Sequence, residues 1–131
     1  MKQNRNDRPP LSEAQLEIMN VVWGAGRTTV AEVWQRLSAR RKIARNTVQT
    51  MMKRLEEKGW LKHTEDGNTF VYSAAVPRGK TLRSMVLSLV DSAFEGSAEG
   101  LIHALIQGRT ISDDEARRIR KMIDEAKGGR S

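Results

Sequence analysis

Residues 44–61 read ARNTVQTMMKRLEEKGWL, and this segment decides how the rest of the chain is interpreted. On a helix, with about 100° between successive residues, its apolar side chains gather on one side and predict a buried face. These residues are Ala44, Val48, Met51, Met52 and Leu55. The opposite side and its flank carry amides, hydroxyls and cations, on Asn46, Thr47, Gln49, Thr50, Lys53 and Arg54. Such groups contact the base edges and phosphates of duplex DNA, but the solvated face of an ordinary surface helix can carry them too.

A predicted β-hairpin follows this helix directly. Gly59 stands where the helix is expected to end, and residues 61–74, LKHTEDGNTFVYSA, form two half-apolar runs separated by Asp66-Gly67-Asn68. Short alternating runs around such a turn predict two antiparallel strands. A polar-faced helix followed by a hairpin is the pattern of a winged helix-turn-helix, in which the helix enters the major groove and the hairpin lies against the flanking backbone. We therefore predict a mainly α fold with a small β-hairpin wing, and a role in DNA binding.

Two shorter helices are predicted ahead of this segment, each opening with a capping box. Ser12 begins S-E-A-Q and Thr29 begins T-V-A-E. In each, the hydroxyl can accept a hydrogen bond from the main-chain amide three residues later, and the side chain of that later residue can accept one from the amide of the Ser or Thr. The first helix is expected to end near Gly24 and the second near Leu37. Their predicted inward residues are Leu16, Met19, Val22 and Trp23, then Val30, Val33, Trp34 and Leu37. Thr28 is predicted to add a short strand to the wing sheet.

Further candidate DNA contacts flank the reading helix on both sides. Arg40, Arg41 and Lys42 lie in the turn before it, next to Arg45 at its start. Each cation that neutralises a phosphate releases counterions, so this cluster is expected to add affinity without sequence preference, although a charged turn is often only solvated. The wing candidates for backbone contact are Lys62, His63, Asn68 and Thr69. Phe70 and Tyr72 share one strand face and are predicted to be core residues rather than stacking platforms.

The composition favours a polyanionic partner. The chain has 131 residues, 23 of them basic and 16 acidic, with a net charge of +7, and the basic excess is larger in residues 1–75 than in residues 76–131. The absence of cysteine excludes a disulfide framework and a thiolate metal site, and it fits a reducing compartment. No apolar run approaches the ~20 residues of a membrane span and no signal peptide is visible, so a cytoplasmic protein is expected. Residues 1–10, MKQNRNDRPP, predict a disordered basic arm.

The second half is predicted to form a dimerisation region of three helices. Three apolar stripes at helical spacing follow Pro77, and the third opens with a capping box formed by Ser112 and Glu115. Residues 77–126 are too few to bury this apolar surface alone, so packing against a second copy is expected; the alternative is a small monomeric bundle folded back on the winged helix. The predicted interface residues are Leu82, Met85, Val86, Leu89, Val90, Ala93, Leu101, Leu105, Ile119, Met122 and Ile123. The predicted limits are 1–10 for the arm, 11–76 for the winged helix-turn-helix domain, 77–126 for the dimerisation domain and 127–131 for a flexible tail.

No pattern in the sequence points to catalysis. His63 and His103 have no acidic residue at metal-ligand spacing, and Ser97 lacks a G-x-S-x-G context. We therefore predict a protein that is not an enzyme and that uses no metal and no cofactor. The alternative to a DNA-binding repressor is a winged-helix interaction module for protein or single-stranded nucleic acid, which predicts apolar residues on the outer face of the reading helix.

Four stretches of the chain resemble one family. They read LSEAQLEIMNVVW, TVAEVWQRL, NTVQTMMKRLEEKGWL and VYSAAV. This arrangement is similar to the penicillinase and methicillin-resistance repressor family (BlaI/MecI/CopY type), over about residues 11–126. The resemblance implies a homodimeric repressor of β-lactamase, antibiotic-resistance or related genes, bound to a palindromic operator and inactivated through a membrane-bound sensor metalloprotease or its product. It also implies that the third helix reads the major groove through the matching positions Asn46, Thr47, Gln49, Thr50 and Arg54.

Two features depart from the family pattern. At the family's cleavage position this chain has Ala104-Leu105 in place of Asn-Phe. The copper-responsive branch carries a Cys-rich C-terminal motif, and the absence of cysteine excludes copper sensing by that motif.

Overall fold

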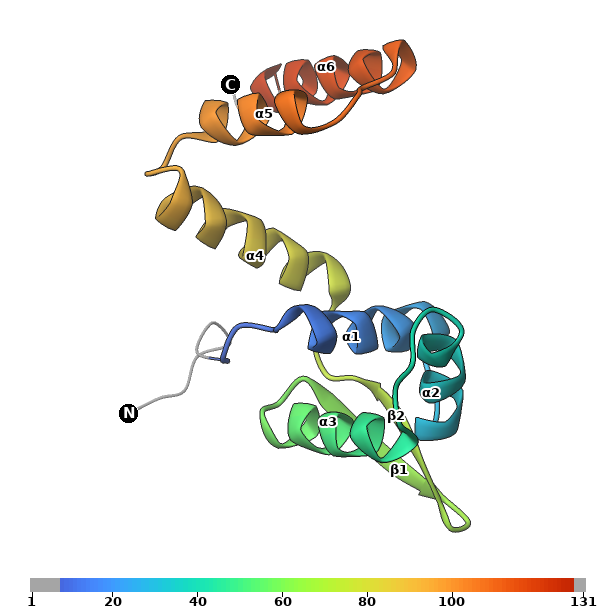
Figure 1. The fold of residues 1–131 in the computed structure, drawn as a ribbon. Coiled ribbons are helices and arrows are strands. Elements are labelled where there is room, and N and C mark those ends of the chain that lie inside the picture. The colour runs from blue at the N-terminus through green and yellow to red at the C-terminus, as the bar shows by residue number, and fades with distance from the viewer. Residues whose placement is uncertain (1–7, 129–131) are drawn as a thin grey trace, which may run out of the picture. The chain divides into compact units, whose positions relative to one another are not determined.

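The computed structural model describes residues 8–128, and within them the chain forms six helices and one hairpin (Figure 1). In chain order the elements are α1 (Glu13–Ala25), α2 (Val30–Ser38), α3 (Arg45–Glu57), β1 (Leu61–Asp66), β2 (Thr69–Ala74), α4 (Arg78–Ala93), α5 (Ala98–Gly108) and α6 (Asp113–Gly128). The prediction of a mainly α fold with a small β-hairpin is therefore confirmed. The chain divides within α4, between Val86 and Leu87, into an N-terminal winged unit and a C-terminal helical unit.

The first two helices begin at the predicted capping boxes. The Ser12 hydroxyl oxygen accepts from the Gln15 amide (3.1 Å) while the Ser12 amide donates to Gln15 Oε1 (2.9 Å). Thr29 and Glu32 make the same pair of bonds, at 3.2 and 3.0 Å. A capping side chain of this kind stabilises a helix by about 1 kcal/mol, so these four residues fix where α1 and α2 begin.

The core of the winged unit lies between α1, α2, α3 and the base of the hairpin. Its buried apolar residues are Ile18, Met19, Val22, Val33, Leu37, Val48, Met52, Leu55, Trp60, Leu61 and Tyr72. Leu16 and Trp23, predicted to be inward, are only half-buried, and Ile18, which was not predicted, has no exposed surface. The prediction of Ala44 as a core residue is wrong: its backbone is extended, with φ −78° and ψ 144°, so it caps α3 from outside the helix and its side chain is exposed.

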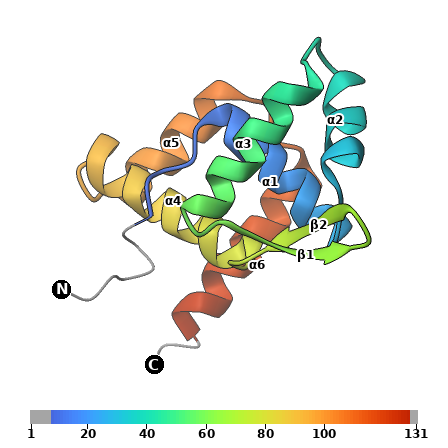
Figure 2. The same cartoon turned by 90° about the horizontal axis from the view of Figure 1, so that it is seen from below.

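The hairpin pairs in a simple antiparallel register. Leu61 faces Ala74 at the base and Asp66 faces Thr69 beside the turn. Thr28 adds the predicted short bridge, since its amide donates to the Tyr72 carbonyl (2.9 Å) and the Tyr72 amide donates back (2.7 Å). Figure 2 shows that the hairpin starts at the C-terminal end of α3 and runs back beside it.

Gly59 makes the reversal between α3 and β1. Its φ of +89° is a conformation that side chains strongly disfavour. Arg8 closes over this turn, donating from Nε to the Gly59 carbonyl at 3.1 Å and lying 5.6 Å from the centre of the Trp60 ring. The predicted disordered arm covers residues 1–10; residues 1–7 lie outside the described part, but Arg8 is held against the fold.

The first turn of α4 is attached to the winged unit. The Arg78 guanidinium donates to the Asn20 side-chain oxygen of α1 (3.4 Å), and the buried Thr81 hydroxyl donates to the Pro77 carbonyl (2.9 Å). The division of the chain between Val86 and Leu87 comes later than the boundary after residue 76 expected from the sequence.

In the C-terminal unit, α5 and α6 begin at serine caps. The Ser97 hydroxyl accepts from the Gly100 amide (2.9 Å) and the Ser112 hydroxyl from the Glu115 amide (3.1 Å). The Glu115 carboxylate accepts from Arg109 (3.1 Å) instead of from the Ser112 amide. Of the predicted capping box, the structure therefore shows only the bond from the Glu115 amide to the Ser112 hydroxyl. The last helix includes Lys127 and Gly128, which had been assigned to the tail, and residues 129–131 lie outside the described part. Between residues 8 and 128 no helix is long and apolar enough to cross a membrane.

Candidate nucleic-acid interface

The outer face of α3 is polar and open to solvent. Val48, Met52 and Leu55 are fully buried on its inner face. The predicted reading residues, Arg45, Asn46, Thr47, Gln49, Thr50, Lys53 and Arg54, are all exposed. The helix begins without a side-chain cap on its first amides. Because such amides carry partial positive charge, this end of α3 favours an approaching phosphate.

A hollow of about 690 Å³ lies between α2, α3 and the hairpin. Arg45, Gln49 and Lys53 line it from α3. His63, Asn68 and Thr69 line it from the hairpin, and the first turn of α2 closes one side. Six of the predicted contact residues, from two separate elements, therefore share one concave surface. Asn46, Thr47, Thr50 and Arg54 do not line this hollow.

His63 is bonded within the protein. Its Nδ1 atom lies 2.6 and 2.8 Å from the two carboxylate oxygens of Glu56, in the last full turn of α3. Its ring stacks on Phe70, with the ring centres 3.9 Å apart and the planes at 11°. The Tyr72 ring lies 5.6 Å away. His63 was predicted to contact the DNA backbone, and in the structure its side chain links α3 to both strands of the hairpin.

The core prediction holds for Tyr72 and fails for Phe70. Tyr72 is 4% exposed, whereas Phe70 is 43% exposed. Both lie on the same face of β2, but Phe70 pairs opposite the exposed Glu65, nearer the turn. The core ends before Phe70, and this ring packs on His63 instead.

Two ionisable groups in the winged unit have shifted pKa values. Burial raises the pKa of the Tyr72 phenol, and the negative charge of Glu56 raises it further. The pKa of Glu32 is lowered, first because its carboxylate accepts the Thr29 amide proton and then because it accepts from the Thr28 hydroxyl. The lowered pKa reflects the capping box that holds the first turn of α2 beside the hollow.

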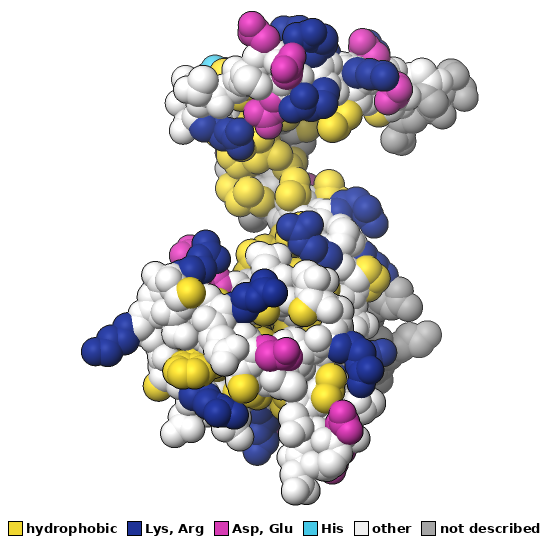
Figure 3. Space-filling view, turned by 90° about the vertical axis from the view of Figure 1, so that its right-hand side faces the viewer, with side chains coloured by type: hydrophobic (Ala, Val, Ile, Leu, Met, Phe, Trp, Pro, Cys, Tyr) yellow, Lys and Arg dark blue, Asp and Glu magenta, His cyan; other side chains and the backbone are white. Residues whose placement is uncertain are grey.

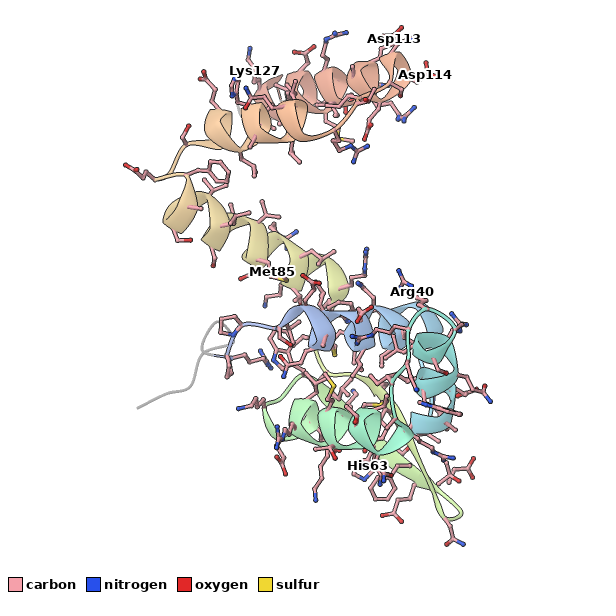
Figure 4. The ribbon with its side chains drawn as sticks, in the orientation of Figure 1. Arg40, His63, Met85, Asp113, Asp114 and Lys127 are labelled. Carbon is pink, nitrogen blue, oxygen red and sulfur yellow. The ribbon has the colours of Figure 1, made fainter. Side chains whose placement is uncertain are left out.

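The basic turn between α2 and α3 lies apart from the hollow. Arg41 pairs with Glu17 of α1 at 2.8 Å, which ties the turn to the first helix. Figure 4 shows Arg40 on the α1 side of the winged unit, away from His63 and the hairpin. Lys42 is exposed in the same turn, and Lys62, next to His63 on β1, points to the other face of the strand. The structure therefore separates these four residues from the six that line the hollow.

Sequence reasoning missed the role of Glu56, which was not among the predicted site residues. Glu56 and Glu57 also line the hollow. The signal that could have found it is an acid in the last turn of α3 followed, after the Gly59 reversal, by a histidine early in the next strand. Within residues 8–128 no group of three or more His, Cys, Asp or Glu side chains could hold a metal ion.

Comparison with known proteins identifies the family. The family model described as penicillinase repressor matches residues 11–125. This chain belongs to the penicillinase repressor family. It is 27% identical over 119 residues to the penicillinase repressor of Bacillus licheniformis, covering 91% of this chain and 93% of that one. It is 20% identical over 115 residues to the methicillin resistance regulatory protein MecI of Mammaliicoccus sciuri, covering 88% and 94%.

A solved structure of the same family supports the winged-helix fold. The solution structure of the DNA-binding domain of the repressor BlaI matches 60% of this chain and 90% of that domain, with a TM-score of 0.51 and 36% sequence identity. The family resemblance and the winged helix-turn-helix fold are thus confirmed. The protein is a BlaI-type DNA-binding repressor, a class without enzymatic activity.

Proposed function

We propose that this protein is a homodimeric repressor that binds a palindromic operator, with α3 in the major groove and the hairpin on the flanking backbone. The observation that carries the proposal is the shared hollow, where Arg45, Gln49 and Lys53 of α3 meet Asn68 and Thr69 of the hairpin. A strand of duplex DNA that passes between a recognition helix and a wing has to run through such a hollow.

The residues on α3 divide by chemistry into base-reading and phosphate-binding groups. The amides of Asn46 and Gln49 can each make two hydrogen bonds to an adenine edge in the major groove. The cations of Arg45, Lys53 and Arg54 are suited to phosphates, with Arg54 on the flank of the helix. The exposed residues 45–47, 49, 50, 53 and 54 of α3 are all polar or charged. A module for protein or single-stranded nucleic acid predicts apolar side chains on this face, so that alternative receives no support.

We propose a second copy of the chain as the partner of the C-terminal helices. Neither α5 nor α6 has a buried residue, and Leu105, Met122 and Ile123 are about half exposed or more. Figure 3 shows apolar side chains gathered at the surface of the C-terminal unit. Each Å² of apolar surface removed from water contributes about 25 cal/mol, so covering these side chains would stabilise a complex. In a two-fold dimer each copy covers the same surface of the other, so one apolar patch serves as both halves of the interface. A two-fold axis between copies then requires two half-sites in the operator.

For induction, the proposal differs from what the family resemblance implies. Ala104 and Leu105 lie inside α5, and both are exposed. The family's protease cuts between Asn and Phe, and neither of those side chains is present at this position. We therefore expect that the family's sensor metalloprotease does not cut this chain between Ala104 and Leu105. Incubating the purified protein with such a protease and measuring its intact mass tests this; a cut between Ala104 and Leu105 would contradict it.

Selection from a random duplex library, followed by fluorescence anisotropy at several salt concentrations, tests the main proposal. We expect an enriched palindrome and an affinity that falls steeply with salt, because several phosphates are neutralised at once. Equal binding to all duplexes, or affinity for single strands alone, would contradict it.

A further inference from the structure

The contact between Glu56 and His63 joins the reading helix to the wing at one point. Glu56 is in the last turn of α3 and His63 is the third residue of β1, and Gly59 reverses the chain between them. The carboxylate and the imidazole Nδ1 lie 2.6 Å apart at the nearest oxygen, with both side chains partly shielded from solvent. A bond between a carboxylate and a ring nitrogen in this setting restricts how far β1 can move from α3.

The same imidazole also holds the second strand. His63 pairs opposite Tyr72, and Phe70 lies two residues nearer the turn on the same face of β2. The stacked rings of His63 and Phe70 therefore form a diagonal contact across the two strands. Through one ring, α3, β1 and β2 are fixed together.

Beyond this point the hairpin has no support from the core. From Thr64 to Phe70 every residue is exposed. A two-stranded hairpin is marginally stable by itself, so its free half takes its direction from the last contact with the body of the protein. That free half carries Asn68 and Thr69, which line the same hollow as Gln49.

We propose that Glu56 and His63 are positioning residues, which hold the hairpin against α3 so that Asn68 and Thr69 reach the same duplex as Gln49. This inference rests on the proposed function. Glu56 acts through His63 and not by touching DNA, because a carboxylate repels phosphates. The raised pKa of Tyr72, to which Glu56 contributes, is consistent with a carboxylate held at this place.

A double-mutant cycle tests the inference, using the selected operator duplex and fluorescence anisotropy. In the unmodified protein, replacing both Asn68 and Thr69 by Ala should weaken operator binding roughly threefold to tenfold, as expected when hydrogen bonds to the sugar-phosphate backbone of the DNA are lost. In the Glu56→Gln background the same double replacement should cost less than in the unmodified protein, because a neutral amide holds the imidazole more weakly than a carboxylate does and the outer half of the hairpin is then less fixed. Gln49→Ala, on α3 itself, should cost the same in both backgrounds.

Glu57→Gln is the matched control. Glu57 is the next residue of α3, lines the same hollow and loses the same charge on replacement. A general effect of removing negative charge should appear in both variants, whereas only Glu56→Gln should reduce the contribution of Asn68 and Thr69. His63→Leu keeps an apolar side chain against Phe70 but removes the bond to Glu56, and it should behave like Glu56→Gln.

The outcomes separate this inference from the proposed function. If the unmodified protein ignores duplex DNA, the proposed function is wrong. If it binds, but replacing Asn68 and Thr69 costs nothing, or costs as much in Glu56→Gln or His63→Leu as in the unmodified protein, the positioning role is overturned. Circular dichroism of each variant confirms that helix content is retained, so a lost contribution cannot be assigned to unfolding.

Discussion

The indole nitrogen of Trp34, in α2, donates a hydrogen bond of 2.9 Å to the main-chain oxygen of Ile43, just before α3. The bond spans the turn between the two helices and fixes the position at which α3 begins. A similar bond of 3.0 Å joins Trp23 of α1 to the carbonyl of Val76, after the hairpin. The two tryptophans thus secure the connections on either side of the segment formed by α3 and the hairpin.

Trp34→Phe should lower both stability and DNA affinity. Phenylalanine keeps an aromatic ring but leaves the Ile43 carbonyl without its donor, which costs about 1 kcal/mol. Because Ile43 directly precedes α3, the first turn of that helix should also be less fixed. Trp23→Phe is the matched control: we expect a similar loss in urea denaturation and a smaller loss of operator affinity, since Val76 follows the hairpin. Equal losses of affinity in both variants would show that Trp34 has no special relation to α3.

Gly59→Ala should destabilise the winged unit by roughly 1 kcal/mol or more, because a side chain is strained at positive φ. Its Cβ would also lie 3.2 Å from Arg8 Nε. Gly24→Ala is the contrasting change, since Gly24 is inside α1 with no other atom near an added Cβ. That replacement should stabilise the protein by about 0.5 to 1 kcal/mol through helix propensity. Urea denaturation of the two variants should therefore shift in opposite directions, and a shift in the same direction would be contrary to this account.

The parts of the fold that depend on local chemistry were predictable from the sequence. Ser12 and Thr29 start helices because a hydroxyl and an acid or amide three residues later satisfy each other, whatever the rest of the chain does. The hairpin turn at Gly67-Asn68 is equally local. Alternation along β2 showed which face Phe70 shares with Tyr72, but it could not show where the core ends.

The parts that depend on contacts between distant residues were not predictable. Arg41 meets Glu17 only because α1 and the basic turn pack together, so a charge cluster expected at DNA is partly used within the protein. Glu56 meets His63 only because the chain reverses at Gly59 and runs back beside α3. The exposed face of α3, by contrast, follows from its periodicity, and its predicted reading residues are all exposed.

The single tyrosine of the chain gives a direct test of the winged unit's electrostatics. Burial and the Glu56 carboxylate raise the pKa of Tyr72, so its phenolate absorption should appear at higher pH in the folded protein than in denaturant. Because the folded state holds this proton more tightly, the stabilisation is complete below the unfolded pKa and is lost as pH rises through the folded pKa. Glu56→Gln should move the folded titration to lower pH, and Tyr72→Phe should remove the signal. A folded titration that coincides with the denatured one would refute the predicted shift.

Gln49→Ala and Arg54→Ala should weaken DNA binding in different ways. If Gln49 reads a base, its loss should reduce operator affinity by about 1 to 3 kcal/mol and leave binding to random duplex nearly unchanged. If Arg54 contacts a phosphate, its loss should weaken binding to both duplexes alike. The slope of log affinity against log salt concentration should also become shallower by about 1, because one phosphate contact is lost. Anisotropy titrations with operator and scrambled duplex at three salt concentrations distinguish these outcomes. Equal losses on both duplexes for both variants would mean that the division of roles on α3 is wrong.

Leu89→Asp should separate dimerisation from folding. Leu89 is in the part of α4 that belongs to the C-terminal unit and is about half exposed, so a carboxylate there can remain solvated in a single chain. Within an apolar interface between two copies, the same carboxylate would be buried without a partner, which costs several kcal/mol. We therefore expect a monomer by analytical ultracentrifugation and an unchanged helix content by circular dichroism, because the capped helices of the winged unit do not involve Leu89. Operator binding should then show one occupied half-site at a time, with a much lower affinity for the full palindrome. A variant that remained dimeric would place the interface on another surface, whereas one that lost its helices would show that Leu89 supports the fold of the single chain.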